Sequence, residues 1–266
     1  MPESEATRAE PGSARWWTER AAAAGRRRPR AGGLTTERIV ETALEVLREG
    51  GLDALTLRAL ANRLGSSRVS NASLYRHIAS RDELIVLIVD HLMGQVRLEP
   101  TGRGWRADVE ALMRDIRRVI LIQTLPTSVT RSRSAYGPNM LRVVDAVLGL
   151  FLGAGLTNQQ AAFATTTMIE FVANATTIER TIAGHRPPGA IAAAGFDELL
   201  DTLPAGQFTA LRTAGADYMA ASADDVFTRG MAIVLDGIAS QLGPPATGAA
   251  RAPRSLRDPP GHPGAG

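Results

Sequence analysis

Apolar residues recur three and four positions apart along most of the chain between residues 35 and 242, with polar residues between them. This spacing places the apolar side chains on one face of an α-helix, whereas a half-buried strand would alternate apolar and polar residues. No alternating stretch of useful length is present. The pattern therefore predicts an all-α protein whose helices are separated by breaks that contain glycine and proline.

Four short helices are predicted between residues 35 and 95, because each begins after a hydroxyl-bearing residue that can cap its first turn. Glycine, which commonly ends helices, follows the first two. The fourth helix opens with Ser80-x-x-Glu83, the spacing of a capping box, and covers residues 81–95. The expected caps are Thr36, Thr56, Ser70 and Ser80, and the expected stops are Gly50, Gly51 and Gly65.

A second set of helices follows a polar break at residues 99–102. Helical spacing predicts them at residues 104–124, 138–153, 157–183, 206–220 and 222–242, with a short helix at 194–202. Residues 1–33 and 243–266 are weakly patterned, which predicts a flexible basic N-terminal arm and a disordered tail. Within the arm, Trp16 and Trp17 indicate a short helix over residues 13–24.

Three short helices with a tight glycine turn between the second and third are what a helix-turn-helix unit requires. The second helix braces the third, whose outward side chains reach base edges in the major groove of DNA. Ser70-Asn71-Ala72-Ser73 provides small and polar outward residues, and Leu74 and Ile78 provide the inward apolar ones.

Charge is distributed unevenly, although the net charge of the chain is only +3. Residues 54–81 contain five arginines and no acidic residue, whereas residues 187–242 contain two arginines and seven carboxylates. This asymmetry favours a basic head facing DNA and an acidic body held away from it, although clustering on a solvated face would give the same pattern. All 30 basic side chains are arginine, whose planar guanidinium suits phosphate and guanine.

Several classes of protein are disfavoured by what the 266 residues lack. There is no cysteine for disulfides or zinc, and no uninterrupted apolar stretch of about 18 residues for a transmembrane helix. The polar, acidic start MPESEATRAE predicts a cytoplasmic protein without a secretory signal. The four histidines are scattered and no HExxH, GxSxG, Walker or GxGxxG motif occurs, so no enzyme activity, metal or cofactor is expected.

The ordered series of motifs over residues 36–84 resembles the N-terminal domain of TetR-family transcriptional regulators. It runs T-x-x-I-x-x-x-A from Thr36, GLDALTLR-x-LA-x-RLG from Gly51, VSNASLYRHI from Val69 and RDEL from Arg81. Family members usually pass directly from the Leu-Gly of the second helix to the Val-Ser ahead of the third. Here Ser66-Ser67-Arg68 intervenes, which affects the angle of the recognition helix and not the fold.

The resemblance implies a division of the chain into four parts. These are the arm (1–33), a helix-turn-helix DNA-binding domain (34–80), a helical ligand-binding and dimerisation domain (81–242) and the tail (243–266). Helix 81–95 links the head to the body. The partners implied are a pseudo-palindromic double-stranded DNA operator, a small-molecule effector and a second copy of the chain, with no membrane.

Candidate DNA contacts come from the resemblance and from side-chain chemistry. Helix N-termini favour anions, and a basic arm can lie along phosphates or in the minor groove. Asparagine suits adenine and arginine suits guanine in the major groove. The residues expected to contact the backbone are Arg27, Arg28, Arg30, Thr56, Arg68, Ser70, Tyr75, His77 and Arg81, and those expected to read bases are Asn71, Ser73 and Arg76.

Each of these assignments has a plainer alternative. Tyr75 as a core ring with a solvated hydroxyl, His77 as a structural residue and Arg68 as a solvated loop residue fit the same pattern. For Ser70 the two roles are capping the third helix and binding a phosphate. For the arm the alternative is a tail that only increases solubility.

The ligand pocket is expected between helices 104–124, 138–153 and 157–183, and the dimer surfaces on helices 157–183 and 222–242. Glu170 and Asn174 lie one turn apart in an otherwise apolar helix, which suggests a polar part of the pocket. The alternative for every candidate is packing in the core. The candidates are Arg117, Tyr136, Met140, Phe163, Met168, Glu170, Phe171, Asn174 and Thr177.

The function expected is that of a repressor released from its operator when a small molecule binds the body and helix 81–95 moves the head. The alternative is a DNA-binding regulator that has no small-molecule ligand and is constitutive or controlled by a protein partner. Repression and activation are not separated by the sequence, because the outcome depends on where the operator lies.

Overall fold

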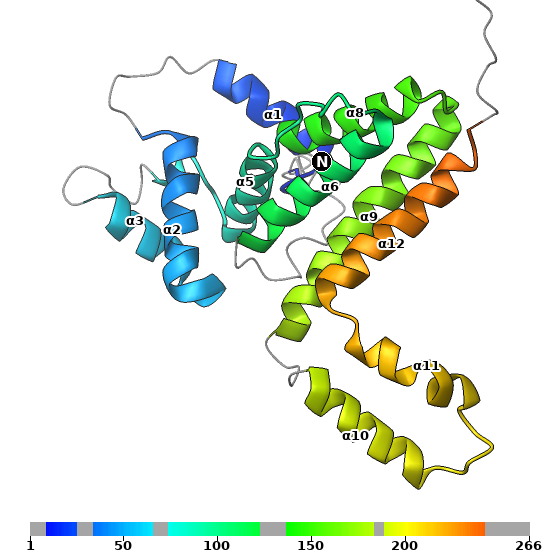
Figure 1. Ribbon diagram of the computed structural model, residues 1–266. Coiled ribbons are helices and arrows are strands. Elements are labelled where there is room, and N and C mark those ends of the chain that lie inside the picture. Colours follow the sequence, from blue (N-terminus) through cyan, green and yellow to red (C-terminus); the bar gives the residue numbers. More distant parts are fainter. Residues whose placement is uncertain (1–8, 26–33, 66–73, 123–136, 184–188, 243–266) are drawn as a thin grey trace, which may run out of the picture.

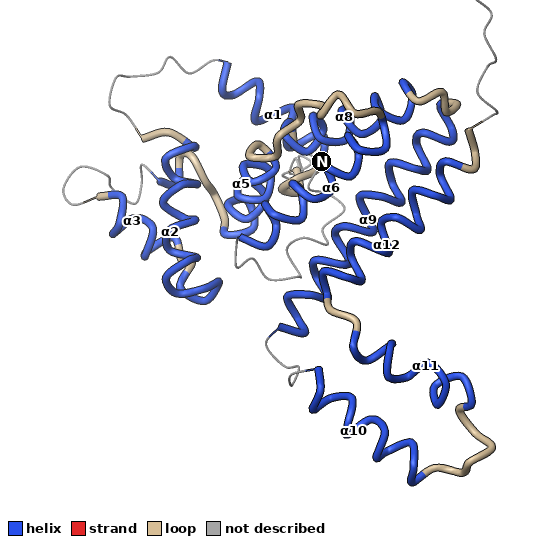
Figure 2. The backbone as a smooth tube through the Cα atoms, in the orientation of Figure 1, coloured by secondary structure: helices blue, strands red, loops and turns tan. Residues whose placement is uncertain are grey.

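A computed structural model describes residues 9–25, 34–65, 74–122, 137–183 and 189–242. Every regular element within these ranges is a helix, which confirms the all-α fold class (Figure 2). The helices form a small head, a larger body and a projecting pair (Figure 1). In the described ranges, no helix combines the length and the apolar character needed to cross a membrane.

The head is built from α2 (Thr36–Ala54), α3 (Leu57–Leu64) and the start of α5 (Arg81–Met93). Thr56 and Ser80 cap α3 and α5 as expected, because their side-chain oxygens accept hydrogen bonds from the backbone N–H of Ala59 and Glu83.

The prediction that Thr36 caps the first helix is wrong by one residue. The cap is Thr35, whose hydroxyl accepts a hydrogen bond from the backbone N–H of Arg38, and Thr36 is the first helical residue. Gly51 interrupts the end of α2 with a φ of 68°, a left-handed conformation that glycine adopts without strain.

The body consists of α5 with α6 (Trp105–Ile122), α8 (Pro138–Gly153), α9 (Asn158–Ala183) and α12 (Ala223–Ala239). These bounds lie within a few residues of those predicted. Ser222 caps α12, and Thr157 exchanges hydrogen bonds with Gln160 at the start of α9 in a capping box. The largest buried side chains of the body, among them Met113, Phe151, Met168 and Phe227, fill the space between these helices.

Two further helices, α10 (Gly189–Thr202) and α11 (Thr209–Ala220), pack against each other and extend away from α9 and α12 (Figure 1). The first is longer than the short helix predicted at residues 194–202. Gly215 brings the pair close together, since a Cβ atom there would lie 2.9 Å from the ring of Phe196.

A short helix, α1 (Ala14–Gly25), forms where the two tryptophans predicted it. The side chain of Trp16 is 7% exposed and belongs to the same continuous apolar core as the head and the body. This part of the N-terminal segment is therefore packed onto the rest of the molecule.

Candidate functional site

The head holds the end of the expected recognition helix on an apolar base. Leu74 and Ile78 are fully buried, together with Leu60 of α3, as the inward positions of the predicted helix-turn-helix require. The residues between them, Tyr75 and Arg76, point away from this core and are exposed. The base therefore fixes which side of the segment faces solvent.

Tyr75 and His77, two of the residues expected to bind DNA, lie between these buried side chains. The ring of Tyr75 is 55% exposed, so the alternative of a core ring does not apply. His77 is half-buried, and its carbonyl oxygen accepts a hydrogen bond from Arg20. Its backbone N–H donates to Leu74, which closes the last turn of the segment.

Thr56 and Arg81 lie at the first turns of α3 and α5 and are exposed. The hydroxyl oxygen of Thr56 accepts the capping hydrogen bond, which leaves its O–H able to donate to a phosphate. The guanidinium of Arg81 donates to the carbonyl of Leu52 in the turn after α2. Arg81 thus helps to hold the turn that precedes α3.

The remaining DNA candidates lie outside the described residues and stay predictions. They are Arg27, Arg28 and Arg30 of the arm, and Arg68, Ser70, Asn71 and Ser73 ahead of Leu74. Tyr136, a ligand candidate, also lies outside the described ranges.

Arg117 is a structural link between three helices of the body. Its guanidinium makes two hydrogen bonds of 3.0 Å to Glu179 of α9 and one of 2.6 Å to Asp224 of α12, and it lies 4.4 Å from the ring centre of Phe227. Burial alone would lower the pKa of Arg117, but the two carboxylates outweigh burial and raise it. The side chain is therefore a permanently charged tie from α6 to α9 and α12.

The other ligand candidates lie on different sides of the body helices. Met168 is fully buried, and Met140, Phe171 and Thr177 are half-buried. Phe163, Glu170 and Asn174 are exposed on the outer face of α9, so a single copy of the chain does not enclose them. Glu170 and Asn174 share a face as expected, but this face points away from the body core.

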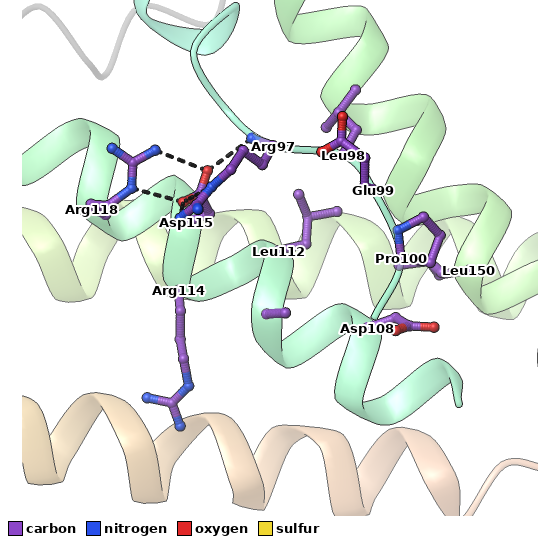
Figure 3. Close-up of a pocket in the computed structure, with 11 residues that line it drawn as sticks. Arg97, Leu98, Glu99, Pro100, Asp108, Leu112, Arg114, Asp115, Arg118 and Leu150 are labelled. Atoms are coloured by element: carbon purple, nitrogen blue, oxygen red, sulfur yellow. Dashed lines mark hydrogen bonds and ion pairs between the residues drawn. The ribbon is translucent and has the colours of Figure 1, made fainter. Parts of the chain in front are cut away.

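A surface groove of about 480 Å³ lies between the segment that follows α5, helix α6 and the end of α8 (Figure 3). Leu112 and Leu150 line it together with the arginines Arg97, Arg114 and Arg118. None of the predicted ligand residues lines it. The sequence signal was present only as a run of arginines in α6, which also fits a solvated helix face.

Asp115 holds two of the arginines that line this groove. Its buried carboxylate accepts hydrogen bonds from Arg97 and Arg118 at distances of 2.7 to 3.2 Å, including one from the backbone N–H of Arg97 (Figure 3). Burial would raise the pKa of Asp115, but these donors outweigh burial and hold the pKa well below its usual range. The carboxylate is therefore ionised and keeps both arginines in place.

A second buried carboxylate, which the sequence reasoning missed, joins α5 to α8. The Oδ1 atom of Asp90 accepts hydrogen bonds of 3.0 and 3.1 Å from the backbone N–H groups of Asn139 and Met140, at the first turn of α8. Burial raises the pKa of Asp90, although these hydrogen bonds oppose the shift. Its only sequence signal was its place as the one carboxylate in the apolar stretch 84–93.

Two family descriptions match most of the described chain. Residues 39–88 match the bacterial regulatory proteins of the tetR family, and residues 99–242 match the tetracyclin repressor-like C-terminal domain. Together they cover the head and the body, but they leave α1 outside both matches.

Two curated relatives are similar to this chain over about half of their own length. An HTH-type transcriptional regulator of Saccharopolyspora erythraea is 35% identical over 46% of this chain and 51% of its own. The HTH-type transcriptional repressor DrrR1 of Streptomyces coeruleorubidus is 30% identical over 48% and 47%. The chain thus spans about half the length of these two relatives.

Solved structures extend the similarity to the whole fold. The TetR family protein ActR of Streptomyces coelicolor, solved in complex with actinorhodin, has a TM-score of 0.69 and 30% identity. The match covers 80% of this chain and 98% of that one. Because a family match spans more than half of the sequence, and the fold and the helix-turn-helix core agree with it, the chain belongs to the TetR family of bacterial regulatory proteins.

Proposed function

We propose that this protein is a dimeric transcriptional repressor that binds an operator in double-stranded DNA and leaves it when a small molecule binds the body. The observation that carries the proposal is the exposed Tyr75-Arg76 pair, held outward by the buried Leu74 and Ile78. It lies in a segment, residues 54–81, that contains five arginines and no carboxylate. The arginines of such a segment attract phosphates, and one of them, Arg63, is also paired with Glu45 and Glu49 of α2.

The head would contact DNA through two kinds of residue. Thr56 and Tyr75 offer exposed hydroxyl groups to phosphates, and such contacts set position and affinity. Arg76, with Asn71 and Ser73 ahead of it, would read base edges in the major groove. His77 and Arg81 also make hydrogen bonds within the head, so each would contact a phosphate in addition to its role in the fold.

The dimer would form on the outer faces of α9 and α12. Large apolar side chains on these faces are more than half exposed in the single chain, which is costly in water unless a partner covers them. They are Phe163 and Ile178 of α9 and Val226 and Ile233 of α12. A second copy would bury them and present two heads to successive major grooves.

The effector would bind in the body, whose relative ActR was solved with actinorhodin. Met140, Met168, Phe171 and Thr177 line the interior side of α8 and α9 and remain the candidates for contact with it. The bonds from Asp90 of α5 to the first turn of α8 give a physical route from this region to the head. A ligand that shifts α8 would thereby shift α5, which enters the head at Arg81.

The test is binding of the purified protein to fragments of the DNA beside its own gene, with unrelated DNA as competitor and over a range of salt. We expect one fragment to be retained against competitor. The Tyr75→Phe variant, which loses only the hydroxyl, should bind it about tenfold more weakly, because a hydrogen bond to a charged group is lost. Tyr218→Phe, at an exposed tyrosine on α11 far from the head, is the matched control.

Binding that any DNA competes for and that modest salt abolishes would contradict the proposal, because only the nonspecific phosphate attraction would then be present. Equal affinities of the two tyrosine variants would contradict the assigned contact. Compounds that release the retained fragment identify the effector class, and binding of ligand and operator must weaken each other equally.

A further inference from the structure

Helix α1 lies outside both family matches, yet it contacts the head and the body. We propose that α1 is a brace within the chain that fixes the angle of the head on the body, with Arg20 and Trp17 as its positioning residues. The role in operator selection rests on the function proposed above.

On the head side, Arg20 joins three elements. Its guanidinium donates to the carbonyl of His77 at 3.3 Å, to the hydroxyl of Thr36 at 3.1 Å and to the carboxylate of Glu83 at 2.7 Å. These partners lie at the end of the recognition segment, the start of α2 and the start of α5. One side chain therefore holds the ends of the three elements that set the orientation of the head.

The pair between Arg20 and Glu83 is sheltered from solvent. The two side chains are 20% and 8% exposed, so water screens their attraction less than it screens a surface pair. Glu83 also accepts a hydrogen bond of 2.8 Å from the backbone N–H of Ala79, and its own N–H donates to Ser80. Arg20 is thus anchored to the corner where the head ends and α5 begins.

Two tryptophans keep α1 on the surface of the molecule. Trp16 is buried, and its ring meets that of Trp17 edge to face at 4.7 Å between centres. The guanidinium of Arg20 lies 5.3 Å from the centre of the Trp16 ring, so the same residue that binds the head also packs on this pair.

On the body side, Trp17 lies against the start of α8. A Cβ atom on Gly137 would come 2.6 Å from the Trp17 ring and 2.3 Å from the carboxyl group of Asp90. Only glycine fits at this close approach. Trp17 therefore lies against the joint at which Asp90 of α5 accepts hydrogen bonds from the first turn of α8.

The consequence is mechanical. Helix α5 alone would connect head and body through a single axis, about which the head could turn. A second link through α1, from the start of α8 to the recognition segment, limits that rotation. In a dimer the angle of each head sets the distance between the two recognition segments, so the brace would narrow the range of half-site spacings that the dimer accepts.

The first experiment measures backbone hydrogen exchange in the full chain for Arg20→Ala, Trp17→Ala and the control Arg15→Ala. Arg15 lies on the same helix but is 67% exposed and bonds only Glu19 in the described contacts. We expect exchange about tenfold faster at residues 74–83 in Arg20→Ala and at residues 137–141 in Trp17→Ala, with no change in the control.

Exchange that is unchanged outside α1 in all of these variants would overturn the brace. This measurement needs no operator, so it decides the brace even if the proposed function fails.

The second experiment compares the retained DNA fragment with versions whose half-sites are one base pair closer or farther. We expect Arg20→Ala to reduce the preference for the natural spacing by about fivefold or more, and Arg20→Lys, which keeps the charge beside Glu83, to restore part of it. A uniform loss of affinity at all spacings would mark Arg20 as merely structural and overturn its positioning role.

Discussion

Two aspartates of the body show how neighbours decide the state of a buried carboxylate. Asp115 faces two guanidinium groups, which lower its pKa, whereas Asp90 accepts hydrogen bonds from amide groups and burial raises its pKa. The two groups therefore affect stability in opposite directions. The contribution of Asp115 is lost as pH falls below the ordinary carboxyl value, and that of Asp90 is lost as pH rises above it.

This difference predicts the behaviour of Asp90→Asn. The ordinary pKa of Asp is 3.8 and the folded value of Asp90 is higher, so stabilisation by its protonated form is complete below 3.8 and disappears as pH rises through the folded value. The amide oxygen of asparagine can keep both backbone hydrogen bonds without becoming charged. We expect the variant to lose less stability than the natural protein as the pH rises above 3.8.

Thermal unfolding at a series of pH values measures this difference. Asp145→Asn, at an exposed position on α8, is the control and should follow the natural protein. If the curve for Asp90→Asn ran parallel to that of the natural protein over the whole range, Asp90 would not titrate in the way its burial implies.

At the scale of the helix, the ends were predictable from sequence because capping is local. The caps at Thr56 and Ser80 were identified from residues no more than three positions away. The choice between Thr35 and Thr36 was not predictable in this way. The hydroxyl of Thr36 bonds Arg20, which lies 16 residues earlier in a helix that the sequence only indicated.

The buried face of each helix was harder to predict than the residues at which the helix begins and ends. Helix α9 has apolar residues around much of its circumference, so its pattern does not separate the core side of Met168 from the outer side of Phe163. The partners of buried charged residues could not be predicted from the sequence, for a different reason. Arg117 bonds residues 62 and 107 positions away, and spacing along one helix carries no information on such contacts.

Arg117 gives a prediction at this scale, since it ties α6 to α9 and α12. Replacing it by Met removes two hydrogen bonds to Glu179 and leaves that carboxylate partly buried without its partner. We expect a loss of about 2 kcal/mol, with little of it from the exposed Asp224, and a fall in Tm of roughly 4–8 °C.

A double-mutant cycle with Glu179→Leu separates the interaction energy of the Arg117–Glu179 pair from the effects of each substitution on other neighbours. The double variant should regain much of the lost stability, because no unpaired charge is left. Arg229→Met, at an exposed position on α12, is the control and should change Tm little. A single variant as stable as that control would show that Arg117 does not hold the three helices together.

At the scale of the whole molecule, the distribution of surface chemistry separates three tasks. Residues 54–81 contain five arginines, the projecting α10–α11 pair contains four carboxylates, and exposed apolar side chains lie on the outer faces of α9 and α12. Helices α9 and α12 lie side by side along the body (Figure 1). A second copy that covers these faces would therefore leave both heads directed away from the contact.

Ile233 tests this arrangement, because its side chain is 71% exposed in the single chain and would be central to the covered surface. Ile233→Asp would bury a carboxylate in that surface, so we expect monomers at concentrations where the natural protein is dimeric. Light scattering after size separation measures this directly. Leu141→Asp, at an exposed leucine on α8, is the control and should remain dimeric.

The operator affinity of the same variant links assembly to function. A monomer reads one half-site and loses the gain that comes from joining two binding events, so its affinity should fall by about 100-fold or more. Circular dichroism and thermal unfolding should stay near those of the natural protein, since the side chain of Ile233 is mostly exposed in the single chain. A monomeric variant that still bound the operator with full affinity would show that each head acts alone, and the dimer would then have no part in choosing the site.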